Sequence, residues 1–199
     1  MKKLVIFVFL FLGIGSGIVL GQKVFYKPEQ TDPKISAITA VVKDNREEAI
    51  PAKPVELEIL KLNLKGVLVE YVGLDKEGKM DVPKNSDNVA WFDLGFRPGK
   101  KGNAVLAGHF DKETGDPAVF YNLNLLETGD RISLEDENGE VKIFEVKDKK
   151  LYSYNAFPTE FVFGKSERRM LNLITCDGTW DSVSKNYSNR LVVFTELIE

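Results

Sequence analysis

The first part of the chain is set apart by its hydrophobic pattern. An uncharged, mostly apolar stretch from Leu4 to Gln22 directly follows Lys2 and Lys3. As a helix, its roughly 19 residues would reach about 28 Å, close to the hydrocarbon thickness of a bilayer. Positive charge before an apolar run directs the following chain outward, and no small-x-small cleavage site follows. We therefore expect residues 1–22 to be a transmembrane signal anchor rather than a cleaved signal peptide.

The second part, residues 23–54, is polar, carries charges of both signs and shows no sustained hydrophobic period. Such a composition cannot cover a domain core, and it is typical of a solvated stalk. We expect this stalk to hold the rest of the chain off the outer face of the cell membrane, in a single-pass extracytoplasmic arrangement. The stalk is punctuated by four prolines: Pro28, Pro33, Pro51 and Pro54.

The third part, residues 55–199, shows the alternation of short β-strands. Residues 55–59 alternate in one phase and residues 60–64 in the opposite phase, which predicts a bulge or bend between Ile59 and Leu60. Many short strands at regular spacing indicate an all-β domain, most simply a closed or nearly closed β-barrel. The other predicted strands cover residues 66–72, 103–107, 131–135, 141–146, 171–176 and 191–197.

The connections between these strands carry their own signals. Asn138-Gly139 predicts a tight hairpin turn. Trp91-Phe92 is expected in a short helix or turn, and residues 110–126 in a short helical connection packed on the sheet. Residues 177–189 are expected to form a polar loop. The aromatic stretch from Tyr152 to Phe163 fits either a cover for the core or a wall of a binding groove.

Composition adds two constraints. The 27 basic and 30 acidic residues nearly balance, so nothing indicates a nucleic-acid partner. The single cysteine, Cys176, excludes an internal disulfide and leaves an unpaired thiol in an exported domain. A buried, inert cysteine is one explanation for that thiol. A reactive nucleophile is the other.

Three reactive side chains lie where a predicted strand meets a loop: the lone Cys176, the lone His109, and Arg190. A cysteine thiolate is a strong nucleophile, and a neighbouring imidazolium or guanidinium stabilises it. If Cys176 attacked a peptide carbonyl, Arg190 could stabilise the oxyanion and His109 could protonate the leaving amine. The product would be a thioester. Taken singly, each of these residues is more often structural.

The segments Leu173-Ile-Thr-Cys176, Asn189-Arg190 and Ala107-Gly-His109 together resemble the sortases, the cysteine transpeptidases of bacterial cell envelopes. The resemblance implies an eight-stranded sortase-type β-barrel with short helices, preceded here by the N-terminal transmembrane helix. It also implies Cys176 as nucleophile, His109 as general acid and Arg190 as oxyanion or substrate stabiliser. Further matches lie at Val82-Pro83, Asn88–Trp91, Arg97–Gly99, Asp116–Phe120 and Gly129–Ile132.

The same resemblance implies the partners. The donor would carry a C-terminal Leu-Pro-x-Thr-Gly-like sorting signal, and the acceptor would be an amine of a cell-wall precursor or a pilin lysine. The segments around Ala107-Gly-His-Phe-Asp111 and Phe120 are most similar to the class F group, with classes D and E also compatible. The match departs from the family pattern at Cys176-Asp177-Gly178, and the following loop carries Trp180 and Tyr187.

No cofactor and no metal is expected. Asp111, Glu113 and Asp116 suggest calcium at first sight, but they lack a rigid ligand spacing and read better as a solvated acidic turn. Papain-like peptidases place the cysteine before the histidine, the reverse of the order here. The cysteine-type L,D-transpeptidases require a Ser-His-Gly-Cys motif that this sequence lacks.

Two alternatives remain at this stage. A sortase-like thiol hydrolase would release surface proteins by using water as the acceptor. A non-enzymatic tethered β-barrel would bind a peptide or wall component and keep Cys176 buried and inert.

Overall fold

The computed structural model describes residues 50–199. The expected signal anchor and nearly all of the expected stalk therefore lie outside the described residues. Within residues 50–199, no helix is long and apolar enough to cross a membrane.

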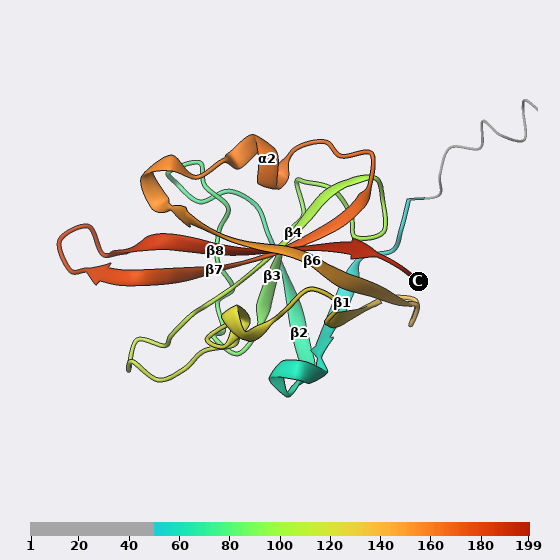
Figure 1. Ribbon diagram of the computed structural model, residues 1–199, viewed down its shortest axis with the longest axis horizontal. Helices are drawn as coiled ribbons and strands as arrows, with labels where there is room; N and C mark the ends of the chain where they lie inside the picture. Colours follow the sequence, from blue (N-terminus) through green and yellow to red (C-terminus); the bar gives the residue numbers. More distant parts are fainter. Residues whose placement is uncertain (1–49) are drawn as a thin grey trace, which may run out of the picture. The chain divides into compact units, whose positions relative to one another are not determined.

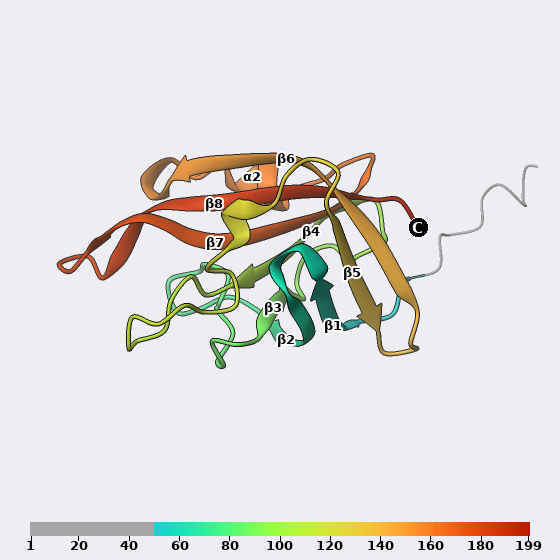
Figure 2. The same cartoon turned by 60° about the horizontal axis from the view of Figure 1, so that its bottom comes forward.

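The described part of the chain is an eight-stranded barrel of mixed parallel and antiparallel strands, closed in the order β1-β2-β3-β4-β7-β8-β6-β5. Figure 1 shows the barrel from one side, and β5 is labelled in Figure 2. The predicted all-β barrel with short helices is confirmed. The strands are β1 (Pro54–Ile59), β2 (Leu64–Val72), β3 (Val89–Phe92), β4 (Gly102–Gly108), β5 (Arg131–Asp136), β6 (Val141–Ser153), β7 (Arg169–Asp181) and β8 (Asn186–Leu197). The helical turns are η1 (Leu60–Leu62), η2 (Leu123–Leu125), η3 (Tyr154–Ala156) and α2 (Thr159–Phe163).

Two of the neighbouring strand pairs, β2 with β3 and β4 with β7, are parallel, and the other six are antiparallel. A parallel pair cannot be joined by a tight turn and needs a crossover connection. The crossover from β2 to β3 spans residues 73–88, and the one from β4 to β7 contains β5, β6 and α2. Because β4 and β7 run in the same direction, their carboxyl-terminal parts lie at the same edge of the barrel.

The core has two layers because the sheet is covered on both faces around β4, β7 and β8. One cluster fills the barrel interior, with Trp91, Phe120 and Phe144 as its largest buried side chains. A second cluster lies outside, where the connection containing α2 packs on residues such as Ile174. Strands buried on both faces are continuous apolar runs rather than alternating ones, which explains the uninterrupted burial from Met170 to Thr175.

Two sequence expectations about local structure were wrong. Trp91 and Phe92 belong to strand β3, paired with both β2 and β4, because Trp91 is 1% exposed and fills the barrel core. Residues 177–189 are not a loop, because β7 and β8 continue as a paired hairpin that extends beyond the barrel (Figure 2). The hairpin is held by a cross-strand aromatic pair, Trp180 with Tyr187, whose ring centroids lie 5.2 Å apart.

Other expected connections are confirmed in simpler form. The bend after Ile59 is the single 3-10 turn η1, closed by Asn63 in the left-handed conformation. The expected helical connection between residues 110 and 126 is reduced to the 3-10 turn η2. The turn at Asn138-Gly139 joins β5 to β6, as predicted.

This β5–β6 hairpin contains a buried ion pair. Lys142 Nζ lies 2.8 Å from Asp136 Oδ2, with the two side chains 11% and 4% exposed. Burial alone would raise the pKa of Asp136, but hydrogen bonds from Lys142 and from the backbone N–H groups of Asn138 and Glu140 outweigh it and lower that pKa. The charged pair therefore stabilises the turn at neutral pH.

We expect Lys142→Met to lower the free energy of unfolding at pH 7 by about 3 kcal/mol, because it leaves the Asp136 carboxylate buried without its cation. Chemical denaturation followed by tryptophan fluorescence measures this change. The lowered pKa of Asp136 means that the carboxylate's contribution is complete above its ordinary value of 3.8 and is lost as the pH falls through the lower folded-state value. The difference between the two proteins should therefore shrink in acid.

Lys150→Met is the matched control, because Lys150 and Asp148 form a similar pair that is about half exposed. Exposed ion pairs contribute little to stability. A loss of stability of the same size in both variants would contradict a special role for the buried pair.

Candidate active site

Strand register brings the three predicted residues together. The parallel pairing of β4 with β7 places Ala107 beside Ile174. His109 follows Ala107 by two residues, just past the end of β4, and Cys176 follows Ile174 by two residues on β7. On the other side of β7, the antiparallel pairing with β8 places Cys176 directly opposite Arg190. Three residues that are far apart in sequence thus lie on neighbouring positions at one edge of the barrel.

The end of β4 explains why the cysteine is accessible. Strand β4 stops at Gly108, whereas β7 continues to Asp181, so β7 has no β4 partner beyond this point. Cys176 is the first residue of β7 after the burial ends, and its thiol is partly exposed.

The two residues that precede the histidine and the cysteine join the strands. The buried Thr175 Oγ1 donates a hydrogen bond of 2.9 Å to the carbonyl oxygen of Gly108. Gly108 itself packs so closely that an added Cβ would lie 2.5 Å from a ring carbon of Phe120 and 2.8 Å from Val119 Cγ1. Only glycine fits there without displacing its neighbours. The Gly-His and Thr-Cys pairs of the sequence are therefore a structural unit.

The His109 ring is oriented by the crossover from β2 to β3. Its Nε2 lies 2.9 Å from the carbonyl oxygen of the buried Pro83. A carbonyl oxygen only accepts hydrogen bonds, so Nε2 carries a proton in this arrangement. Nδ1 is then the ring nitrogen left to take up or release a proton.

The Arg190 guanidinium is held from several sides. Its Nη1 donates to the carbonyl oxygens of Asn189 and Tyr187, at 2.8 and 3.2 Å, and its Nη2 donates to Asn186 Oδ1. Its Cζ also lies 4.7 Å from the centroid of the Tyr154 ring, which is a cation–π contact. Among the described residues, these hydrogen bonds use three of the five guanidinium N–H groups, so two remain for a ligand. The charge is fixed before any ligand arrives.

The protonation of Cys176 is set by opposing effects. Burial raises the pKa of the thiol, the positive charge of Arg190 lowers it, and the negative charge of Asp111 raises it, with a net upward shift. The thiol is therefore mostly protonated at neutral pH and needs a neighbouring base to become a thiolate.

Asp111 is tied to the β7–β8 hairpin. The Tyr187 hydroxyl donates a hydrogen bond to Asp111 Oδ2, which raises the pKa of Tyr187 to about 12. Phe110 packs against the same tyrosine ring, with centroids 5.6 Å apart. The segment after His109 and the hairpin after Cys176 are thus joined by a hydrogen bond and an aromatic contact.

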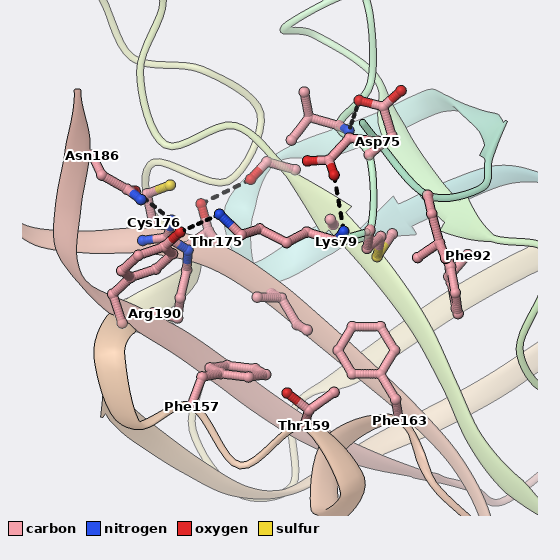
Figure 3. Close-up of a pocket in the computed structure, with 18 of the residues that line it drawn as sticks. Asp75, Lys79, Phe92, Phe157, Thr159, Phe163, Thr175, Cys176, Asn186 and Arg190 are labelled. Atoms are coloured by element: carbon pink, nitrogen blue, oxygen red, sulfur yellow. Dashed lines mark hydrogen bonds between the residues drawn. The ribbon is translucent and has the colours of Figure 1, made fainter. Parts of the chain in front are cut away.

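A pocket of about 800 Å³ opens over these groups (Figure 3). It is large enough for several residues of a peptide. His109, Cys176 and Arg190 all line it, with Thr175 at the base. Aromatic side chains and the β2–β3 crossover form the remaining walls, chiefly Leu74, Asp75, Lys79, Met80, Phe92, Tyr154, Phe157 and Phe163.

The aromatic stretch from Tyr152 to Phe163 has both of its expected roles: it covers part of the core and it forms a wall of the pocket. Tyr154, Phe157 and Phe163 line the pocket, while Val162 is fully buried in the outer core. The sequence interpretation missed Pro83, Lys79 and Asn186 as site residues. Of these three residues, only Pro83 had a signal in the sequence, the Val82-Pro83 match. Its contact with His109 is made by its backbone carbonyl oxygen.

The expectation about metals concerns the acidic segment after His109. In the part of the chain that the structure describes, no group of three or more His, Cys, Asp or Glu side chains is placed to hold a metal ion. Asp116 instead accepts a hydrogen bond from Thr114 Oγ1 at 2.8 Å.

A cysteine, a histidine and an arginine therefore line one pocket that is large enough for a short peptide segment. Comparison with known protein families matches residues 57–198 to the sortase domain. The chain belongs to the sortase family, whose members are cysteine transpeptidases. No curated protein matches the sequence.

Solved structures show the same fold at low sequence identity. Sortase C-1 from Actinomyces oris matches with a TM-score of 0.57 and 21% identity, over 84% of this chain and 98% of that one. Streptococcus agalactiae sortase C1 in complex with MTSET matches with a TM-score of 0.55 and 21% identity, over 72% of this chain but only 66% of that one. The Clostridium perfringens sortase D5 transpeptidase matches with a TM-score of 0.54 and 18% identity, over 85% and 91%. These neighbours do not confirm the expected class F.

We expect the alkylation rate of Cys176 by iodoacetamide to rise with pH and to be still rising at pH 9.0, the ordinary thiol pKa, because the folded-state pKa is higher. Asp111→Asn removes a negative charge and should speed the reaction at pH 8, whereas Arg190→Gln should slow it. Intact-mass spectrometry over time measures the rates.

Asp93→Asn is the control, since Asp93 is an exposed carboxylate that does not line the pocket. An alkylation rate that levels off near pH 7 would contradict this electrostatic account of the thiol. Equal effects of Asp111→Asn and Asp93→Asn on that rate would also contradict it.

Proposed function

We propose that this protein is a membrane-anchored cysteine transpeptidase. It cleaves a C-terminal Leu-Pro-x-Thr-Gly-like sorting signal through a thioester on Cys176. It then transfers the protein to an amine of a cell-wall precursor or a pilin lysine. The observation that carries the proposal is that Cys176, His109 and Arg190 line one pocket, in a chain of the sortase family.

The first half-reaction forms the thioester. His109 takes the thiol proton of Cys176, and Sγ attacks the carbonyl carbon of the signal's threonine, whose carbonyl oxygen becomes an oxyanion. The two unused N–H groups of Arg190 are held rigidly beside the thiol and stabilise that charge as it develops. His109 protonates the amine of the leaving glycine as the carbon–nitrogen bond breaks.

The second half-reaction reverses these roles. His109 takes a proton from the incoming amine, whose nitrogen attacks the thioester carbonyl. A new amide bond forms as the carbon–sulfur bond breaks, and Cys176 Sγ takes the proton from His109 to restore the thiol. With water in place of the amine, the same steps give the hydrolase, which is an outcome of the test below.

The thiol's position favours an enzyme over the inert binding module. A binding module would keep its cysteine enclosed in the core, whereas Cys176 is partly exposed and lines the pocket. Arg190, which lies opposite Cys176, forms no ion pair with a carboxylate within residues 50–199. Its positive charge is therefore available to a ligand in the pocket.

Location and class are part of the proposal. The apolar run after Lys2 and Lys3 supports a single-pass anchor with an extracytoplasmic catalytic domain. An anchor raises the effective concentration of the enzyme toward substrates held in the same membrane. The sequence Ala107-Gly-His-Phe-Asp111 supports class F.

The test uses the full chain in detergent with Leu-Pro-x-Thr-Gly peptides, with and without an added amine, read by mass spectrometry. The proposal predicts a peptide–amine adduct that requires Cys176 and is absent with Cys176→Ala. Cleavage without adduct in saturating amine would indicate the hydrolase. Turnover that survives Cys176→Ala would overturn the proposal.

We expect Arg190→Lys to lower kcat/KM for such a peptide by about 100-fold, the effect of losing one oxyanion donor. A lysine ammonium cannot reproduce the planar fork that binds Asn186, Asn189 and Tyr187 while leaving two N–H groups free. The measurement is steady-state peptide turnover. The control is Arg131→Lys, at an exposed position on β5, and near-normal turnover by Arg190→Lys would contradict the assigned role.

A further inference from the structure

Residues 73–81, at the start of the β2–β3 crossover, form a small hairpin beside the pocket. Leu74 and Met80 pair as an isolated antiparallel bridge. Inside the hairpin, Asp75 Oδ1 accepts the backbone N–H groups of Glu77 and Lys79, each at 2.9 Å. These contacts fix the backbone from which the Lys79 side chain starts.

The Lys79 side chain crosses the pocket from this hairpin to the opposite wall. Its Nζ donates a hydrogen bond of 2.6 Å to the hydroxyl of Tyr154, which belongs to η3. Arg190 Cζ lies 4.7 Å and Lys79 Nζ lies 5.3 Å from the centroid of the same tyrosine ring. Figure 3 shows the lysine reaching toward Cys176 and Arg190. Two cations thus share one phenol ring next to the thiol.

The pocket has an excess of positive charge. Lys79, Lys185 and Arg190 line it, and none of them belongs to an ion pair of the described residues. The carboxylates that line it are those of Asp75 and Asp81. Asp75 is bound to the two backbone N–H groups of its own hairpin, and Asp81 accepts from the N–H of Val82.

The Tyr154 hydroxyl is therefore a weaker hydrogen-bond acceptor for the Lys79 ammonium group than a carboxylate would be. A phenol is a neutral acceptor, whereas a carboxylate forms a shorter and stronger bond with an ammonium group. Lys79 is solvent-exposed, so an incoming peptide can reach it. A carboxylate brought into the pocket can take the place of the tyrosine hydroxyl without leaving a buried group unpaired.

We propose that Lys79 is a specificity-determining residue that selects sorting signals with an acidic side chain at the variable position before the threonine. The inference rests on the proposed function. With the threonine carbonyl at Cys176, an extended peptide places the preceding residue about 3.3 Å further along the pocket. That residue lies within reach of an ammonium group held beside the Arg190–Tyr154 pair.

The hydrogen bond between Lys79 and Tyr154 also favours the charged form of Lys79. It raises the pKa of Lys79 and lowers that of Tyr154. Lys79 is therefore fully charged at neutral pH, as ion pairing with a peptide carboxylate requires.

The test compares three peptides, Leu-Pro-Glu-Thr-Gly, Leu-Pro-Gln-Thr-Gly and Leu-Pro-Lys-Thr-Gly, with the full chain in detergent. We expect kcat/KM to favour the glutamate peptide over the glutamine peptide by about 5-fold at low salt, mainly through KM. Lys79→Gln should abolish this preference, and Lys79→Glu should turn it toward the lysine peptide. Lys76→Gln, at an exposed lysine of the same hairpin outside the pocket, should keep it.

Binding separates this inference from the proposed function. Fluorescence anisotropy measures the Kd of labelled glutamate and glutamine peptides for Cys176→Ala, with and without Lys79→Gln. Preference for glutamate that requires Lys79 supports the inference even if turnover fails. Turnover or binding without that preference would overturn the inference and leave the transpeptidase intact, and no binding of any peptide would also overturn it.

Discussion

The site depends on the parallel pairing of β4 with β7 and on the hydrogen bond from Thr175 to the Gly108 carbonyl that completes it. This pairing sets the histidine level with the cysteine, and the β7–β8 pairing adds Arg190 opposite. Because β4 ends here and β7 does not, the cysteine lies at the point where β7 becomes accessible. The sheet therefore holds Cys176 and Arg190 directly, and His109 follows immediately after the last residue of β4.

Charge around the thiol is distributed on two sides. Arg190 and Lys79 share the Tyr154 ring on the pocket side, while Asp111 is tied to Tyr187 on the other. Burial and Asp111 raise the pKa of Cys176 against the effect of Arg190, so the resting thiol is protected by protonation. The cations remain available for the oxyanion and for a peptide carboxylate, and the same electrostatics thus link reactivity to selectivity.

The sequence was informative where side-chain pattern alone determines structure. The apolar runs of β4, β7 and β8 were predicted, and the structure brings Cys176, His109 and Arg190 together around one pocket. Their expected position at the junction of a strand and a loop was correct for His109 but wrong for the other two, because Cys176 lies within β7 and Arg190 within β8. Trp91 and Phe92 were misassigned because their pairing with β2 and β4 is long-range. The β7–β8 hairpin was missed because its polar residues lack an apolar face. Lys79 joins the site only through the fold of the β2–β3 crossover, which no local pattern encodes.

The most direct test of the central claim is to trap the acyl-enzyme. The full chain is mixed with a Leu-Pro-Glu-Thr-Gly peptide in the absence of amine, quenched in acid and analysed by intact-mass and peptide-mapping spectrometry. The account predicts an added Leu-Pro-Glu-Thr acyl group on Cys176 that hydroxylamine removes, as expected for a thioester. Peptide cleavage with Cys176 unmodified at every time point, or the same adduct on Cys176→Ala, would contradict it.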